Sequence, residues 1–153
     1  MGAIDSKNSV IPINLVLAVL FLCLAATNVY AELRTNMSAD VVIGQADFTS
    51  NTVNPGGVKA NTLYNLTSIF SDGKRLFIAD LINHRVLIYN SIPTSNNASA
   101  DVVIGQADFT SNSINQTGST TVAGANTLYY PSGIFSNGER LFICDGYNNR
   151  VLI

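Results

Sequence analysis

The most conspicuous polar side chains of this sequence follow one pattern, Asp-x-x-Asn-x-Arg, that occurs twice. A carboxylate beside a guanidinium could serve as an acid–base site. The same side chains could instead stabilise a turn, with the carboxylate accepting turn N–H groups and pairing with the arginine. A catalytic set is needed once per protein, so the repetition favours the structural role. The residues are Asp80, Asn83 and Arg85, and then Asp145, Asn148 and Arg150.

His84 is the only histidine of the chain. A zinc site or a histidine-based catalytic system normally draws on several ligands or partner groups. The matching position in the second pattern is Asn149, an ordinary turn residue. We therefore predict no metal or catalytic role for His84.

Asp47 and Asp108 lie in two loops of the same sequence, Asp-Phe-Thr-Ser-Asn. Their oxygen-rich surroundings are compatible with calcium, which prefers hard oxygen ligands. There is no twelve-residue calcium loop and no dense carboxylate cluster, so the favoured interpretation is turn capping by the aspartates and packing by Phe48 and Phe109. The sequence thus predicts no cofactor, with calcium as the weaker alternative.

Four tyrosines could form a ligand-binding face, because tyrosine is well suited to contact surfaces. They could equally anchor long loops by packing, and the sequence does not separate the two roles. They are Tyr64, Tyr129, Tyr130 and Tyr147.

Four Asn-x-Ser/Thr sequons are candidates for glycosylation in a eukaryotic secretory pathway. In a chain this rich in Asn, Ser and Thr, several such sequons are expected by chance. They begin at Asn36, Asn65, Asn97 and Asn115.

The elements that must position these groups are repeated. A thirteen-residue stretch occurs twice with identical letters, at 39–51 and 100–112. Related sequence follows each copy, so the chain divides into two units at about 39–99 and 100–153. Self-similarity of this kind is typical of repeat architectures.

Short apolar and β-branched runs predict the strands of each unit. Asp72-Gly73 between two runs predicts a type I′ hairpin, in which both central residues have positive φ; Asn137-Gly138 is its counterpart. The predicted strands of the first unit are Val41–Ile43, Ser68–Phe70, Arg75–Ala79 and Arg85–Tyr89, and Val102–Ile104 opens the second unit in the same way.

The predicted strands are apolar on both faces, as in Leu76-Phe77-Ile78 and Val86-Leu87-Ile88. Both faces of the sheet must then be covered. No amphipathic helix is predicted after residue 31, so the covering element is another sheet. Units of four short antiparallel strands packed face to face predict an all-β fold, a β-propeller.

Three segments of the chain resemble the NHL repeat. They are residues 78–86, residues 143–151 and Tyr130–Ile134. The resemblance covers residues 39–153 and implies a β-propeller, usually of about six blades. The first unit departs from the family pattern at Leu66-Thr67-Ser68. The chain would hold about two blades as a fragment, with residues 40–45 as an outer strand of a missing blade.

The repeated loops and the absence of a catalytic motif favour a secreted propeller that acts as a non-catalytic scaffold and binds a protein or glycan ligand through its loops. An alternative is a fragment of a metal-dependent propeller enzyme similar to the peptidylglycine amidating lyase, with its site in missing blades. RNA binding, known for some cytoplasmic NHL proteins, conflicts with the net charge of −2. No nucleic-acid partner is therefore expected.

The N-terminal segment reads as a signal peptide over residues 1–31, with a signal helix and a polar lead-in at 32–38. Leu15–Ala26 is an uninterrupted apolar core, and small side chains precede Glu32 as at a cleavage site. The expected location is extracellular or periplasmic, and membrane contact is expected only if this segment stays uncleaved. Cleavage would leave Cys144 as the only cysteine, without an internal disulfide.

Overall fold

The computed structural model describes residues 33–153, and the predicted signal peptide and signal helix lie outside the described residues. Ala39–Ile153 forms one compact unit. The preceding described residues contain one turn, in which the N–H of Met37 donates to the carbonyl of Arg34. Between residues 33 and 153 no helix has the length and apolar character needed to cross a membrane.

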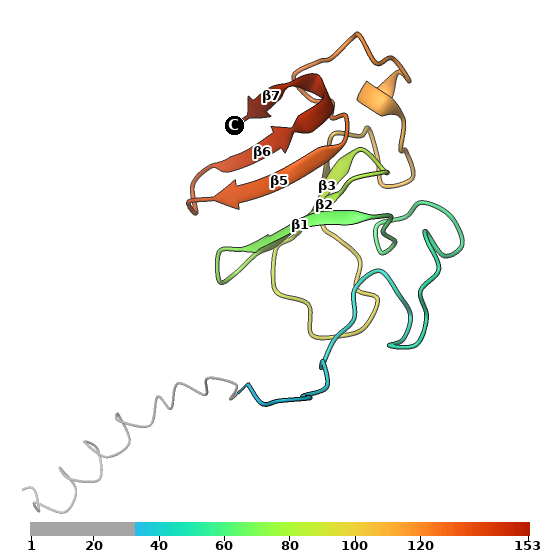
Figure 1. Cartoon of the computed structure of the whole chain (residues 1–153), viewed down its shortest axis with the longest axis vertical. Coiled ribbons are helices and arrows are strands. Elements are labelled where there is room, and N and C mark those ends of the chain that lie inside the picture. The colour runs from blue at the N-terminus through green and yellow to red at the C-terminus, as the bar shows by residue number, and fades with distance from the viewer. Residues whose placement is uncertain (1–32) are drawn as a thin grey trace, which may run out of the picture. The chain divides into compact units, whose positions relative to one another are not determined.

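Two antiparallel sheets make up the fold (Figure 1), so the predicted all-β class is confirmed. The first sheet has the order β1-β2-β3-β4 and the second has the order β5-β6-β7. Helical structure in the described part is limited to two short 3-10 turns, η1 (Ile114–Gln116) and η2 (Gly146–Asn148). The strands are β1 (Leu66–Ser71), β2 (Leu76–Asp80), β3 (Arg85–Tyr89), β4 (Val102–Ile104), β5 (Pro131–Ser136), β6 (Leu141–Asp145) and β7 (Arg150–Leu152).

The central strands β2 and β3 are buried along their whole length. Successive side chains of a strand point to opposite faces, so the apolar runs feed two separate clusters. Leu76, Ile78 and Leu87 pack on one face with Leu63 and other loop residues. The opposite face packs toward the second sheet through a cluster formed by Phe77, Val86, Ile88, Leu128 and Ile143.

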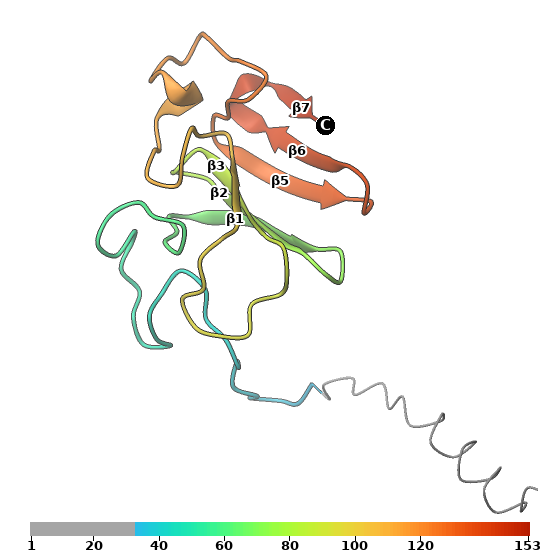
Figure 2. The ribbon, with the colours of Figure 1, turned by 180° about the vertical axis from the view of Figure 1, so that it is seen from behind.

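The two sheets meet along β1 and β5, which lie side by side in both views (Figures 1 and 2). The rings of Phe70 and Phe135 pack edge to face, with centroids 5.4 Å apart. The hydroxyl of Thr67 donates a 3.0 Å hydrogen bond to the carbonyl of Pro131. The expectation that sheet would cover sheet is met at this contact.

The two identical thirteen-residue copies adopt different structures. Val102–Ile104 forms β4 and pairs with β3, with Leu87 opposite Val103. The strand predicted at Val41–Ile43 is wrong, because the structure assigns no strand there. A strand of a sheet requires a neighbouring strand to which it is hydrogen-bonded, and among residues 33–153 only the second copy has one.

The predicted type I′ hairpin is also wrong. Gly73 has φ of +88°, but Asp72 is not among the residues with positive φ. Ser71 pairs with Leu76, so four residues form the loop. The Asp72 carboxylate accepts the N–H groups of Lys74 and Arg75 at 3.0 and 2.7 Å. Capping by the aspartate therefore replaces the two-residue turn.

Candidate functional site

Asp80 ends β2 as a buried carboxylate with three donors. Its Oδ1 accepts the N–H of Tyr64 at 2.8 Å, and its Oδ2 accepts Nδ2 of Asn83 and Nε of Arg85, each at 2.8 Å. Burial raises the pKa of Asp80, while the donated hydrogen bonds and the Arg85 charge oppose this rise. The side chains of Asp80 and Arg85 are both fully buried, so the pair exists only with these compensating bonds.

The remaining N–H groups of Arg85 donate hydrogen bonds to backbone carbonyls. Nη1 donates to Phe109 at 2.7 Å, and Nη2 donates to Thr62 at 2.7 Å and Lys59 at 2.9 Å. These acceptors lie in the loop before β1 and the loop after β4. Arg85 thus ties β3 to the two long loops that flank the first sheet.

Asp145 builds the same arrangement in the second sheet. It accepts the N–H of Tyr129 at 2.7 Å, Nδ2 of Asn148 at 2.8 Å and Nε of Arg150 at 2.7 Å. Nη2 of Arg150 donates to the carbonyls of Gly124 and Thr127. The structure therefore brings together both sets of predicted turn residues, each bound to the loop that precedes its sheet.

Two further asparagines complete these turns, a role that the sequence did not predict for them. Asn54 and Asn83 exchange side-chain hydrogen bonds of 3.0 Å in both directions. Asn115 and Asn148 do the same at 3.1 and 2.8 Å. The sequence signal was available, because Asn54 and Asn115 occupy equivalent places in the repeat. In the structure both have positive φ, which asparagine tolerates.

Three of the four predicted ligand-face tyrosines form one cluster. Tyr129 and Tyr130 stack with centroids 4.8 Å apart, and Tyr147 packs against both at 5.1 and 4.7 Å. Tyr147 is 65% exposed, so its ring forms the outer surface of the cluster. Tyr64 is exposed and takes part in none of these ring contacts.

His84 joins this tyrosine cluster from the first sheet, a position the sequence did not suggest. Its ring lies edge-on to Tyr130 at 4.6 Å and to Tyr129 at 5.5 Å. Its Nδ1 accepts the N–H of Tyr130 at 3.3 Å, so this nitrogen carries no proton. Burial lowers the pKa of His84, which favours the neutral ring. No local signal predicts the contact, because the partners are 46 residues apart.

The tyrosine cluster, here defined as Tyr129, Tyr130 and Tyr147 with His84, includes positions at which the two repeats differ. The places of Tyr130 and Tyr147 are taken in the first unit by Asn65 and Ile82. Tyr129, by contrast, matches Tyr64 in the first unit. The cluster therefore marks the junction of the two sheets as a distinct surface.

Asp47 and Asp108 cap their own loops. Oδ1 of Asp47 accepts the hydroxyl and N–H of Thr49 and the N–H of Ser50 at 2.8 to 2.9 Å. These hydrogen bonds lower the pKa of Asp47 to about 2, with the Thr49 hydroxyl making the largest contribution. The hydroxyls of Thr110 and Ser111, together with N–H groups, likewise lower the pKa of Asp108.

The loop phenylalanines differ, since Phe109 packs against the first-sheet core and Phe48 is 54% exposed. Within residues 33–153 no three His, Cys, Asp or Glu side chains come together as a metal-binding group. Cys144 is an exposed free thiol.

Comparison with known proteins gives no relative: no family model, curated protein or solved structure matches the chain.

Proposed function

We propose that the chain is a non-catalytic binding module of a secreted NHL-repeat β-propeller, and that its ligand contacts the tyrosine cluster. Support for the propeller comes from two stacked antiparallel sheets that carry the same Asp-Asn-Arg turn. Each turn locks the loop before its sheet, so the loops at this end form a fixed surface.

The tyrosine cluster is the observation that carries the proposed binding role. Its rings support one another by stacking and edge contacts, so little side-chain freedom remains to be lost when a ligand binds. Tyrosine offers a large amphipathic surface with few rotatable bonds. A protein or a glycan would find an apolar ring face and phenolic hydroxyls in one place.

The polar groups favour binding over catalysis in this region. Asp80 and Asp145 each accept three donated hydrogen bonds from their own turn and loop. Their arginine partners donate to backbone carbonyls. These charged side chains therefore hold loops in place, which leaves the aromatic rings as the available contact groups.

The proposed function is tested by screening the purified chain against a glycan array and a display library of protein domains. Affinity for the best binder is then measured by calorimetry for the wild type, Tyr147→Ala and Tyr64→Ala. Tyr147→Ala is expected to weaken binding at least about tenfold, as for a contact residue near the centre of an interface. Tyr64→Ala, outside the cluster, is the matched control and is expected to change affinity little.

The proposal is wrong if Tyr147→Ala binds like the wild type while Tyr64→Ala loses affinity. It is also wrong if neither collection yields a binder at micromolar concentration. The class of the binder decides between a glycan and a protein ligand.

A further inference from the structure

Among residues 33–153, the segment Val41–Ile43 and the sheet edge at β7 lack the partner strand that their counterparts in the first sheet have. β7 pairs with β6 on one side only, whereas its counterpart β3 pairs with both β2 and β4. Val41–Ile43 has the sequence of β4 but pairs with no strand. By comparison with the first sheet, β7 lacks a counterpart of β4, and Val41–Ile43 lacks a counterpart of β3.

The Val41–Ile43 segment is already anchored in the manner of β4. A Cβ on Gly44 would lie 2.6 Å from Cδ1 of Leu63, and one on Gly105 would lie 2.5 Å from Cδ1 of Leu128. The two glycines also share positive φ, +86° and +94°. The glycine that follows each Val-Val-Ile segment thus packs equally closely against the equivalent leucine of its own unit.

Backbone groups of Val41–Ile43 are free on one side. The N–H of Val42 donates to Oδ1 of Asn96, and its carbonyl accepts the N–H of Asn97. The peptide groups of Val41 and Ile43 have no partner between residues 33 and 153. In a strand these groups point to the side opposite those of Val42, where a neighbouring strand would pair.

A glutamine within each thirteen-residue copy has an acceptor in the second copy that it lacks in the first. Nε2 of Gln106 donates to the carbonyls of Ser113 and His84, each at 2.9 Å, and the second bond crosses to the turn of the first sheet. Nε2 of Gln45 donates only to Thr52 within the described chain. The repeat places Asn149 at the position of His84, so the carbonyl of Asn149 is the matching acceptor.

Arg150 on the second sheet lacks an acceptor that Arg85 has on the first sheet. Nη1 of Arg85 donates to the carbonyl of Phe109, and this side chain is fully buried. Arg150 is 27% exposed, and its Nη1 has no acceptor in the described part of the chain. The equivalent acceptor is the carbonyl of Phe48, whose ring is 54% exposed.

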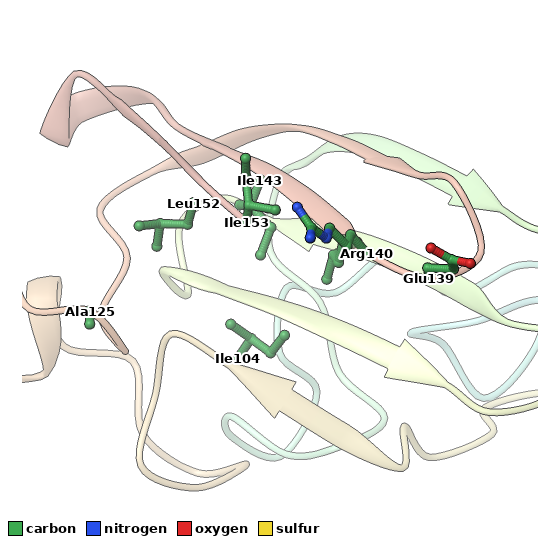
Figure 3. Close-up of a pocket in the computed structure, with 8 residues that line it drawn as sticks. Ile104, Ala125, Glu139, Arg140, Ile143, Leu152 and Ile153 are labelled. Atoms are coloured by element: carbon green, nitrogen blue, oxygen red, sulfur yellow. The ribbon is translucent and has the colours of Figure 1, made fainter.

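A groove of about 590 Å³, lined by apolar side chains together with Glu139 and Arg140, lies beside the edge of β7 (Figure 3). Leu141, Ile143 and Leu152 line it from the second sheet, and Ile104 lies across from them. In the first sheet the matching side chains Leu76, Ile78 and Leu87 are buried, and Val103 of β4 packs against them. The groove is the place where Val42, the counterpart of Val103, would fit.

We propose that Val41–Ile43 of one copy of this chain adds as a fourth strand to β7 of a second copy. The β3–β4 register then sets Ile43 opposite Val151 and Val42 opposite Leu152. Donor strand and acceptor edge are different surfaces of the chain, so the contact is head-to-tail. Such contacts build closed rings or open filaments.

Disulfide trapping tests the register. In a full-length background with Cys23→Ser and Cys144→Ser, one chain carries Val42→Cys and a second carries Leu152→Cys. Mild oxidation of the mixture is expected to give a disulfide-linked dimer joining the two positions, identified by mass spectrometry. The matched control is Val41→Cys mixed with Leu152→Cys, because a one-residue shift turns the side chain to the other face.

The proposal is overturned if the Val42–Leu152 mixture gives no more dimer than the Val41–Leu152 control.

Sedimentation equilibrium supplies a second test that does not depend on cross-linking. The wild-type chain is expected to associate with rising concentration, and Phe48→Ala is expected to weaken association at least tenfold without changing the melting temperature. Phe109→Ala is the matched control, expected to lower the melting temperature because that ring already packs within its own chain. The proposal is also overturned if the wild-type chain stays monomeric up to about 100 μM, a concentration between the micromolar and millimolar dissociation constants of weak association.

Discussion

The backbone N–H of Tyr130 donates a 3.3 Å hydrogen bond to Nδ1 of His84. This bond joins the residue before β5 to the turn between β2 and β3, so it connects the two sheets directly. It requires an unprotonated Nδ1. Burial favours the same neutral state, because it lowers the pKa of His84. Protonation of one side chain would therefore loosen the junction that supports the tyrosine cluster.

The first prediction concerns pH. A histidine whose folded pKa lies below its unfolded value of about 6.5 stabilises the fold fully above that value. Its contribution is lost as the pH falls from there through the folded pKa, at no more than about 1.4 kcal/mol per pH unit. Urea unfolding between pH 7.5 and 5 should show this loss for the wild type.

The control for this prediction is His84→Asn, which should remove the histidine's contribution to the dependence of the unfolding free energy on pH. Asparagine tolerates the positive φ of His84, as the equivalent Asn149 does at +54°. The contribution of Asp80, whose pKa is also shifted, is common to both proteins and cancels in the comparison. Identical slopes for the two proteins would contradict the assignment.

The second prediction compares the two ion pairs. Asp80→Ala leaves Arg85 buried and without its carboxylate, which should cost about 3–5 kcal/mol of unfolding free energy. Asp145→Ala should cost less, because the Arg150 side chain is 27% exposed and retains access to water. Urea denaturation of both variants measures the difference. Equal losses would show that burial of the arginine is not what sets the cost.

The third prediction concerns two glycines with nearly equal positive φ. A Cβ on Gly105 would lie 2.5 Å from Cδ1 of Leu128 and 2.8 Å from the carbonyl oxygen of His84, whereas one on Gly138 meets nothing within 4 Å. Gly138→Ala should cost roughly 1–2 kcal/mol from backbone strain alone. Gly105→Ala should cost about 1–3 kcal/mol more, because the crowding is added. Thermal melts of the two variants give the comparison, and similar midpoints would refute it.

The fourth prediction concerns the sequons. Asn36 and Asn65 are exposed, Asn97 is half-buried and Asn115 is 1% exposed. The Asn115 side chain also bonds to Asn148, Ser119 and Thr127, so a glycan there would break the turn. Expression in a eukaryotic secretory host, followed by glycopeptide mass spectrometry, should find no glycan at Asn115 in folded protein. Full occupancy at Asn115 would contradict the described packing.

Much of the fold could be predicted from local sequence. The runs that form β2 and β3 were found within one residue, because β-branched and aromatic residues flanked by turn signals are strong strand patterns. The Asp-Asn-Arg turns were found because they recur. Their acceptors were not, since the carbonyl of Thr62 is 23 residues from Arg85.

The tyrosine cluster could be predicted only in part. Tyrosines in loops suggested a contact surface, and Tyr64 was grouped with the others because composition alone treats them alike. His84 was set aside as a lone histidine, yet it packs on Tyr130. Ring contacts across two sheets depend on how the sheets stack, and no short-range pattern encodes that.

The sequence by itself determined the repeat, the β-rich fold and the residues of the two turns, because each follows from local composition and spacing. The tertiary structure decided what identical sequence becomes. Val102–Ile104 is a strand and Val41–Ile43 is not, although their letters are the same. The physical reason is that a strand exists through hydrogen bonds to a neighbour, and that neighbour is supplied by the fold.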